Sequence, residues 1–183
     1  MIFQFLFINV YAQTETPASG KYTLVKVVSE YFPAFGKKMK VARVNKSDVA
    51  KLSEPLSALA AYYSCLGGTN CDVNENNDEV CELTMALGLG IQGSEKQILL
   101  LQTWFGDDSV VQRMINQGCY LSISGSNNFS NFSSLSFKQT NDTVFINYEL
   151  DYYSSGSSSS EKFNEIVVIN DGRIKFIKRE LGY

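Results

Sequence analysis

The chain of 183 residues contains no histidine, so its chemistry has to be sought among carboxylates, lysines, tyrosines and thiols. Without imidazole it cannot form a Ser-His-Asp or Cys-His nucleophile, or an H-E-x-x-H metal site. The best-spaced remaining pair is Glu149 and Asp151, which lie two residues apart and so share one face of a predicted strand. If that face lined a pocket, the two carboxyl groups could act as acid and base. If it faces solvent, they are ordinary surface charges, and both interpretations stay open.

A glycine-rich segment, Gly88-Leu-Gly90-Ile-Gln-Gly93, matches the letters of the dinucleotide-binding motif G-x-G-x-x-G. That motif binds a nucleotide only where a strand precedes the first glycine and an acidic residue follows on a second strand. Here helical patterns lie on both sides of the segment. The sequence therefore favours a helix end, a turn and a new helix, and it predicts no nucleotide cofactor.

The segment from Asp72 to Asp78 carries oxygen-bearing side chains at alternate positions, like the opening of a calcium-binding loop. The pattern then fails, because Asn77 stands where the turn needs glycine and Leu83 stands where a bidentate glutamate is needed. We interpret the segment as a solvated loop closed by a disulfide, with a weak calcium site as the alternative. No metal site and no cofactor are predicted for the chain.

The four cysteines are Cys65, Cys71, Cys81 and Cys119. In an exported protein an even number of cysteines usually forms disulfides. Of the three possible connectivities we favour Cys71 with Cys81, which closes the polar loop, and Cys65 with Cys119, which ties a helix end to the start of the sheet. A zinc site is the alternative, and the lack of a C-x-x-C pair disfavours it.

The first thirteen residues are almost wholly apolar and end in Val10-Tyr-Ala12, a small-residue pattern that export peptidases accept. They predict a secretory signal at residues 1–13, followed by a single α+β domain at 14–183 that is secreted or periplasmic. The usual positive start is missing, so the segment could be the end of a longer signal; a buried first strand is the alternative. No later stretch has the roughly 20 apolar residues of a membrane span.

The overall charge gives no reason to expect a nucleic acid or an anionic membrane as partner. The chain has 16 basic and 19 acidic residues, a net charge of −3. The basic residues that cluster in sequence predict a solvated strand edge. They are Lys37, Lys38, Lys40, Arg43 and Lys46.

The elements that position these groups change type near Cys119. Beyond it, residues 143–153 alternate strictly between apolar and polar, as in a strand buried on one face. Residues 135–137 precede this strand as a hairpin partner, and Asp171-Gly172 joins two further strands. The serine-rich run from Ser154 to Ser160 and the passage from Ser122 to Ser134 are expected to be exposed connections. The chain therefore ends in an antiparallel sheet of at least four strands.

Before Cys119, apolar residues recur at steps of three and four, which predicts helices near 47–66, 78–88, 94–105 and 108–116. Ser53, Asn77 or Asp78, Ser94, and Asp107 or Asp108 are their expected N-terminal caps. In the third helix we expect Ile98, Leu101 and Phe105 to form the buried stripe. Residues 38–44 predict a short strand, whereas residues 21–32 fit strand and helix patterns equally well. The expected fold is α+β, with several helices packed on one face of the C-terminal sheet.

The last hairpin, Ile166-Val-Val-Ile-Asn-Asp-Gly-Arg-Ile-Lys-Phe-Ile177, after a run of helices, resembles the ending of nuclear-transport-factor-2-like and SnoaL-like domains. The resemblance covers about the last 45 residues. It implies a curved sheet wrapped by helices around a conical cavity. Because this chain lacks the His and Asp pair of some catalytic relatives, no catalytic residue can be carried over.

Aromatic residues make up 13% of the chain, and Tyr63, Trp104, Tyr148 and Tyr152 are the candidates to line a groove between helices and sheet. The plain alternative is that these rings fill the core. The function favoured by the sequence is noncatalytic binding of a small apolar ligand or a protein partner. The alternative function is an enzyme, such as a hydrolase or isomerase, with Glu149 and Asp151 in a cone-shaped pocket.

Overall fold

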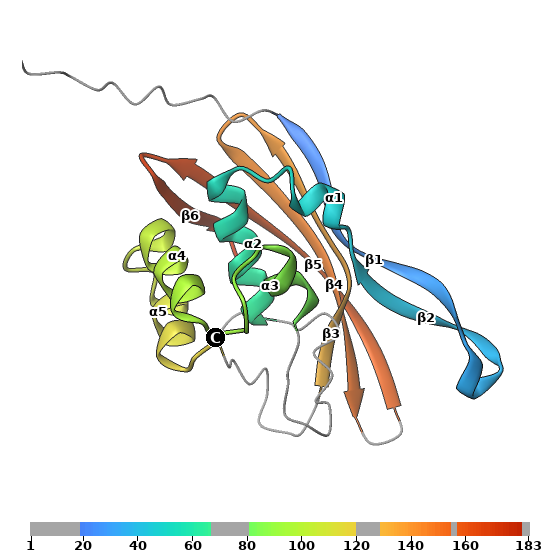
Figure 1. The fold of residues 1–183 in the computed structure, drawn as a ribbon. Coiled ribbons are helices and arrows are strands. Elements are labelled where there is room, and N and C mark those ends of the chain that lie inside the picture. The colour runs from blue at the N-terminus through green and yellow to red at the C-terminus, as the bar shows by residue number, and fades with distance from the viewer. Residues whose placement is uncertain (1–18, 67–80, 120–128, 155–156, 181–183) are drawn as a thin grey trace, which may run out of the picture.

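The computed structural model describes residues 19–66, 81–119, 129–154 and 157–180. These residues form an α+β fold, in which one antiparallel sheet is covered by helices on one face (Figure 1), as the sequence predicted. The predicted signal at residues 1–13, the calcium-like segment 72–78 and the candidate caps Asn77 and Asp78 lie outside the described residues.

The described part of the sheet has six strands in the order β2-β1-β3-β4-β5-β6, and every neighbouring pair is antiparallel. The strands are β1 (Gly20–Phe32), β2 (Lys37–Val44), β3 (Phe129–Thr140), β4 (Thr143–Ser154), β5 (Ser157–Asn170) and β6 (Arg173–Lys178). The helices are the 3-10 turn η1 (Pro33–Phe35), α1 (Lys46–Val49), α2 (Glu54–Leu66), α3 (Glu82–Ala86), α4 (Glu95–Phe105) and α5 (Ser109–Asn116).

Helix α2 is the centre of the molecule, because it lies between the sheet and the outer pair α4 and α5 (Figure 1). Its side chains from Ala58 to Leu66 are all buried, which leaves it no solvated face. Strand β4 supplies the facing surface through Val144, Ile146, Tyr148 and Leu150, which are at most 2% exposed. This is the apolar face that the alternation in residues 143–153 predicted.

The predicted helix at 47–66 is two helices, α1 and α2, separated by residues 50–53. Pro55 explains the break, because proline has no N–H to donate and restricts the residue before it, so a helix can begin but not continue there. The Ser53 hydroxyl does not cap α2, since it is buried without a hydrogen-bond partner. The predicted helix at 78–88 is, within the described residues, the short α3, which has Cys81 as its N-cap residue.

Two segments expected to be exposed connections belong to strands instead. Backbone pairing of β4 with β5 extends to Ser157, so Ser157–Ser160 is part of β5. Likewise β3 begins at Phe129, and Phe132 within it is fully buried. Serine has no strong strand preference, and the facing strand β4 supplies the hydrogen bonds that hold both segments extended.

Candidate functional site

Tyr63 and Tyr148, two of the predicted ligand-binding residues, lie in the core between α2 and β4. They are 0% and 2% exposed, and their ring centroids are 5.3 Å apart. Phe132 and Phe137 of β3 pack against the same Tyr63 ring. Rings so enclosed fill the space between helix and sheet, so these two tyrosines do not line an open groove.

The hydroxyl groups of both tyrosines converge on Glu165, a carboxylate of β5 that is 1% exposed. Tyr63 donates to Oε2 at 2.5 Å, Tyr148 donates to Oε1 at 3.3 Å, and the backbone N–H of Glu180 donates to Oε1 at 3.0 Å. Burial, and secondly the nearby Glu165 carboxylate, raise the pKa of Tyr63 well above 10.0. Nothing in the sequence marks Glu165, because one glutamate in a strand resembles any surface charge.

Trp104 and Tyr152, the other two predicted aromatics, are partly buried and pack against the same hydrophobic core. Trp104 is a half-buried residue of α4, and its Nε1 is buried with no hydrogen-bond partner. Tyr152 is half-buried near the end of β4, and burial raises the pKa of its hydroxyl, with Glu161 as a second cause. Of the four predicted residues, two are thus enclosed in the core and two are partly exposed beside it.

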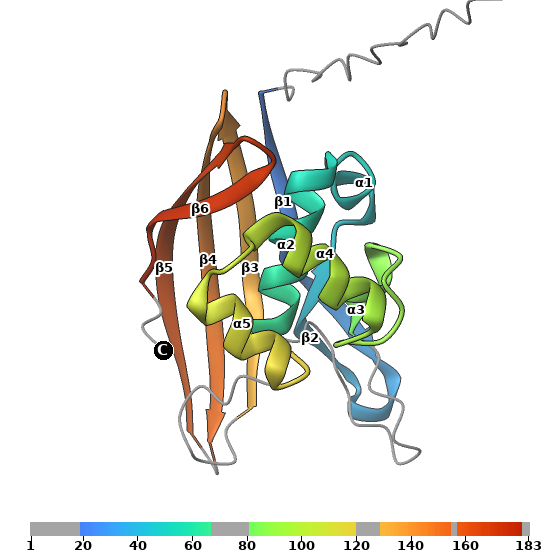
Figure 2. The ribbon, with the colours of Figure 1, turned by 90° about the vertical axis from the view of Figure 1, so that its left-hand side faces the viewer.

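Figure 2 shows helices α2, α4 and α5 together on one side of the sheet. Glu149 and Asp151 alternate in β4 with the buried Tyr148 and Leu150, so they lie on the opposite sheet face. Between them stands Ser160 of β5, whose hydroxyl oxygen is 2.6 Å from Oε1 of Glu149 and 2.8 Å from Oδ1 of Asp151. The serine is exposed, and both carboxylates are partly exposed. The two carboxylates therefore lie on an open part of the sheet rather than in an enclosed pocket.

The glycine-rich segment at 88–93 forms a joint between helices, as the sequence favoured. Helix α3 precedes it and the Ser94 side chain caps α4 by accepting from the Gln97 N–H. Gly93 has φ +75°, and a Cβ there would lie 2.6 Å from the Gly118 carbonyl oxygen. Glycine is thus required at position 93 by the close approach of two backbone segments rather than by a phosphate.

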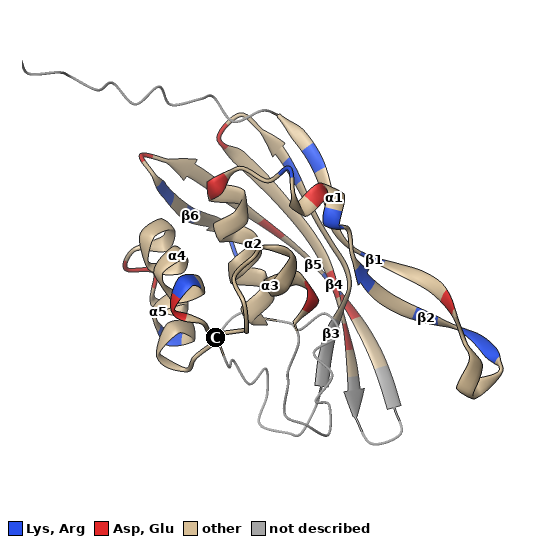
Figure 3. Ribbon diagram, viewed as in Figure 1, with Lys and Arg blue, Asp and Glu red and all other residues tan. Residues whose placement is uncertain are grey.

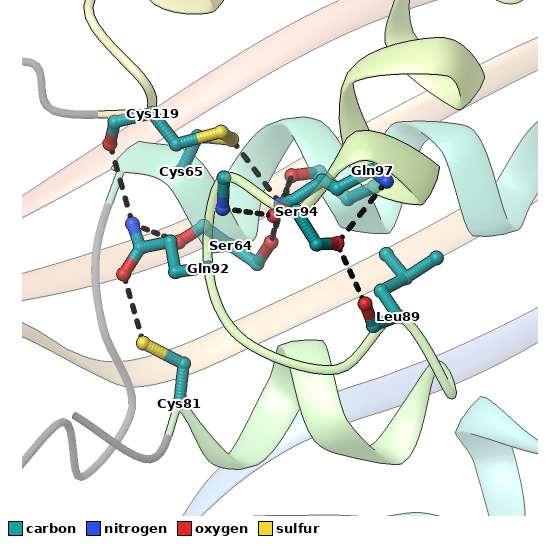
Figure 4. Close-up of a disulfide and its surroundings, with 10 residues drawn as sticks. Ser64, Cys65, Cys81, Leu89, Gln92, Ser94, Gln97 and Cys119 are labelled. Carbon is teal, nitrogen blue, oxygen red and sulfur yellow. Dashed lines mark hydrogen bonds between the residues drawn. A yellow bond between two sulfur atoms is a disulfide. The ribbon is translucent and has the colours of Figure 1, made fainter. Parts of the chain in front are cut away.

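Gln97 organises this joint from the core, where it is 0% exposed (Figure 4). Its side-chain oxygen accepts from the Gly93 N–H at 2.7 Å, and its Nε2 donates to the Ala61 carbonyl and the Ser64 hydroxyl of α2. The buried stripe of α4 is consequently Gln97, Leu101 and Phe105. The expectation for Ile98 was wrong by one position, because the capping glutamine turns inward to satisfy backbone groups.

Cys65 and Cys119 form a disulfide beside this joint, with Cα atoms 4.6 Å apart, which confirms the predicted pairing. Gln92 donates from Nε2 to the carbonyl oxygens of Ser64 and Cys119, and its Oε1 lies 2.8 Å from Sγ of Cys81 (Figure 4). Cys71 lies outside the described residues, so the predicted Cys71–Cys81 bridge stays a prediction.

An open hollow of about 200 Å³ lies on the outer side of this joint. Four of its residues are spaced at i, i+3, i+4 and i+7 on α4, one comes from the joint, and one from the first turn of α2. Its lining residues are Lys96, Leu99, Leu100 and Thr103, with Leu89 and Glu54. We call this the α2–α4 pocket. In the sequence, the pocket is indicated by the adjacent Leu99 and Leu100, because Leu99 lies outside the buried stripe of α4.

The two charged residues of the α2–α4 pocket, Lys96 and Glu54, differ in their contacts. The Lys96 ammonium donates to the Gly88 carbonyl at 2.7 Å and so closes one end of the joint. Glu54 stands in the first turn of α2, where the helix dipole favours an anion. Leu99 is 64% exposed, whereas Leu89 is 6% exposed, so the pocket has a buried apolar wall and an open apolar lip.

No described helix is long and apolar enough to cross a membrane. Within the described residues there is also no cluster of three or more potential metal-binding side chains. Comparison of the chain with protein-family models, with curated proteins and with solved structures finds no match. The resemblance to nuclear-transport-factor-2-like domains therefore stays a prediction.

Proposed function

We propose that this protein is a noncatalytic binding domain that holds an apolar side chain of a protein partner in the α2–α4 pocket. The observation that carries the proposal is the pocket itself, in which Leu89, Leu99 and Leu100 surround an open hollow of about 200 Å³. An apolar side chain that inserts there loses its contact with water, the usual source of binding energy at the centre of a protein interface.

The size of the pocket favours a partner's side chain over a free small molecule. Sites for small ligands usually measure about 300–1,000 Å³ and enclose most of the ligand. This hollow is smaller than that range and open on one side. Glu54 and Lys96 at its edge can pair with polar groups that flank the inserted side chain, which adds specificity more than affinity.

Export to an oxidising compartment is part of the proposal. The Cys65–Cys119 disulfide supports it, since such bonds persist mainly outside the reducing cytosol. The enzyme alternative receives no such support, because Glu149 and Asp151 lie on the open sheet face.

The proposal is tested by selecting peptides from a random phage-displayed library on the wild-type protein. Selected peptides should share one apolar residue, and Leu99→Asp should weaken their binding by at least about tenfold, because a carboxylate cannot be desolvated in the pocket. The matched control is Ile91→Asp, since Ile91 is 69% exposed and lies outside the pocket lining. Equal binding to wild type and Leu99→Asp, or a failure to select any peptide, refutes the proposed site.

A further inference from the structure

The β1–β2 hairpin extends beyond the rest of the sheet as a two-stranded arm (Figure 1). Strand β1 pairs with β3 only from Gly20 to Val25, but it pairs with β2 from Val25 to Phe32. Beyond Val25 each of the two strands therefore has only the other as a sheet neighbour among the described strands. Between Lys26 and Lys40 no side chain is fully buried, so this segment adds nothing to the hydrophobic core.

The arm is positively charged, in contrast to the rest of the chain. Residues 26–43 contain five basic residues and one acidic residue, which leaves eleven basic and eighteen acidic residues elsewhere. Arg43 is held by Glu30 through two hydrogen bonds of 2.6 and 2.7 Å. The charges left over belong to four lysines that make no ion pair with a described residue, three of them near the tip and Lys26 at the base of the arm, opposite Arg43 (Figure 3 colours the basic residues). They are Lys26, Lys37, Lys38 and Lys40.

The tip of the arm also exposes large apolar side chains. Tyr31 is 61% exposed, Phe35 65% and Met39 38%. The turn itself is built by Pro33–Phe35 in a 3-10 conformation, followed by Gly36 at φ 61°. Folding gains nothing from placing aromatic rings in water, so their exposure at a projecting turn marks an interaction site.

The lysines lie on both faces of the arm. Lys38 and Lys40 pair with Tyr31 and Ser29 on one face, whereas Lys37 pairs with Phe32 on the other. A protein that covered one face would meet either Lys37 alone or only Lys38 and Lys40 among the three lysines near the tip. A flat anionic surface that receives the tip end-on meets the lysines of both faces and the aromatic rings together.

From these observations we propose that the tip of the β1–β2 arm docks on a lipid surface that carries anionic headgroups. Tyr31 and Phe35 enter the interface between headgroups and acyl chains, and the lysines lie among the headgroup phosphates, which is the usual division of labour in interfacial binding. The acidic remainder of the chain is repelled by the same surface. End-on docking of the arm is therefore the orientation that the charge distribution favours.

The test is flotation of the full chain with vesicles of phosphatidylcholine, alone or mixed with phosphatidylglycerol. We expect binding only to the mixed vesicles, weaker at high salt, and reduced at least about tenfold in Phe35→Ser and in the triple variant Lys37→Gln/Lys38→Gln/Lys40→Gln. The controls should bind like wild type. They are Ile177→Ser, which is matched in exposure at 67%, and the triple variant Lys21→Gln/Lys138→Gln/Lys175→Gln, whose lysines are exposed.

A second measurement does not depend on loss of binding. In Phe35→Trp the indole should shift its fluorescence to shorter wavelength with the mixed vesicles, whereas Ile177→Trp should not, against a constant signal from Trp104. The proposal is overturned if the protein binds neutral vesicles as strongly as mixed ones, or if it binds neither. It is also overturned if the arm variants and the control variants respond equally. If the protein binds no vesicles, an acidic protein is the partner that the exposed, basic tip fits. The α2–α4 pocket is not involved in either result.

Discussion

The buried carboxylate of Glu165 is held by neutral hydroxyl groups and one backbone N–H. Burying a carboxylate costs free energy unless its oxygens are hydrogen-bonded. Removal of a single donor restores part of that cost and so destabilises the folded state. The bonds also join four places in the fold, because the donors lie on α2, β4 and the segment after β6, whereas Glu165 lies on β5. This group therefore stabilises the packing of the central helix on the sheet.

Tyr63→Phe removes the shortest of these bonds and should lower the free energy of unfolding at neutral pH by about 1–3 kcal/mol. The folded-state pKa of Tyr63 lies well above the unfolded value of 10.0. The unfolded chain therefore ionises first, so the contribution of Tyr63 is fully present below pH 10 and is lost as pH rises from there toward the folded pKa. The loss is about 1.4 kcal/mol per pH unit for one proton.

Urea denaturation of both proteins at pH 7 to 11 measures the effect, and the difference in stability should shrink above pH 10. Tyr31→Phe is the control, because Tyr31 is exposed and has no hydrogen bond to a buried carboxylate. A constant difference across this pH range contradicts the assignment of the alkaline loss to Tyr63.

At the scale of single elements, Asp108 links two parts of the chain. Its side chain accepts from the N–H groups of Val110 and Val111 and so caps α5, which decides between the two caps that the sequence offered, Asp107 and Asp108. The same carboxylate forms an ion pair with Arg179 at 3.1 Å, in which both side chains are less than a quarter exposed. The Arg179 guanidinium in turn lies 3.7 Å above the Phe176 ring of β6. One aspartate thus fixes both the start of α5 and the end of the sheet.

Asp108→Ala should lower the free energy of unfolding by about 1–3 kcal/mol, because both the cap and the ion pair are lost. Arg179→Met should lower the free energy of unfolding by less, since Asp108 still caps α5. Thermal unfolding of the two single variants and the double variant gives the coupling between the residues, which we expect to be about 0.5–2 kcal/mol. Additive costs show that the pair is not coupled.

Local signals predicted much of the fold. Ser94, Asp108 and the Asp171-Gly172 turn each act through their own backbone neighbourhood, and each lies where the sequence placed it. Residues 21–32 were ambiguous, because the choice of strand over helix is made by pairing with β2 and β3. The serines of 157–160 form a strand for the same reason. What could not be predicted depends on pairing with other strands, which the sequence of the segment itself does not show.

The candidate site was less predictable than the fold. The aromatic residues that suggested a groove are drawn into the core around Glu165, because a buried tyrosine needs a polar partner and this carboxylate supplies one. The α2–α4 pocket arises from a second apolar stripe on α4, which the sequence pattern of the helix does not distinguish from the buried stripe. Its depth depends on Leu89, whose position is set by the glycine-rich joint.

At the scale of the whole molecule, the Cys65–Cys119 disulfide closes a loop with a sequence separation of 54 residues around α3, α4 and α5. A bond across a loop of this length should stabilise the folded state by about 4 kcal/mol, mainly by restricting the unfolded chain. Cys65→Ala/Cys119→Ala should therefore unfold at lower urea concentration than the wild type, and reductant should lower the wild type to a similar midpoint. An unchanged midpoint in the double variant shows that the loop is held without the bond.

The pairing of β1 with β3 has a consequence for the order in which the chain acquires its structure. Gly20 lies opposite Gln139, so this seam joins segments that are separated by most of the chain, whereas β3 to β6 are connected by successive hairpins. Contacts between distant segments form late, because the entropy of closing a long loop has to be overcome first. The meander β3–β6 can assemble from local contacts, while β1, which is made before the helices, waits for residues made much later. Until that seam closes, one edge of β3 and one edge of β1 remain open to other chains, and the nascent protein is then most vulnerable to aggregation.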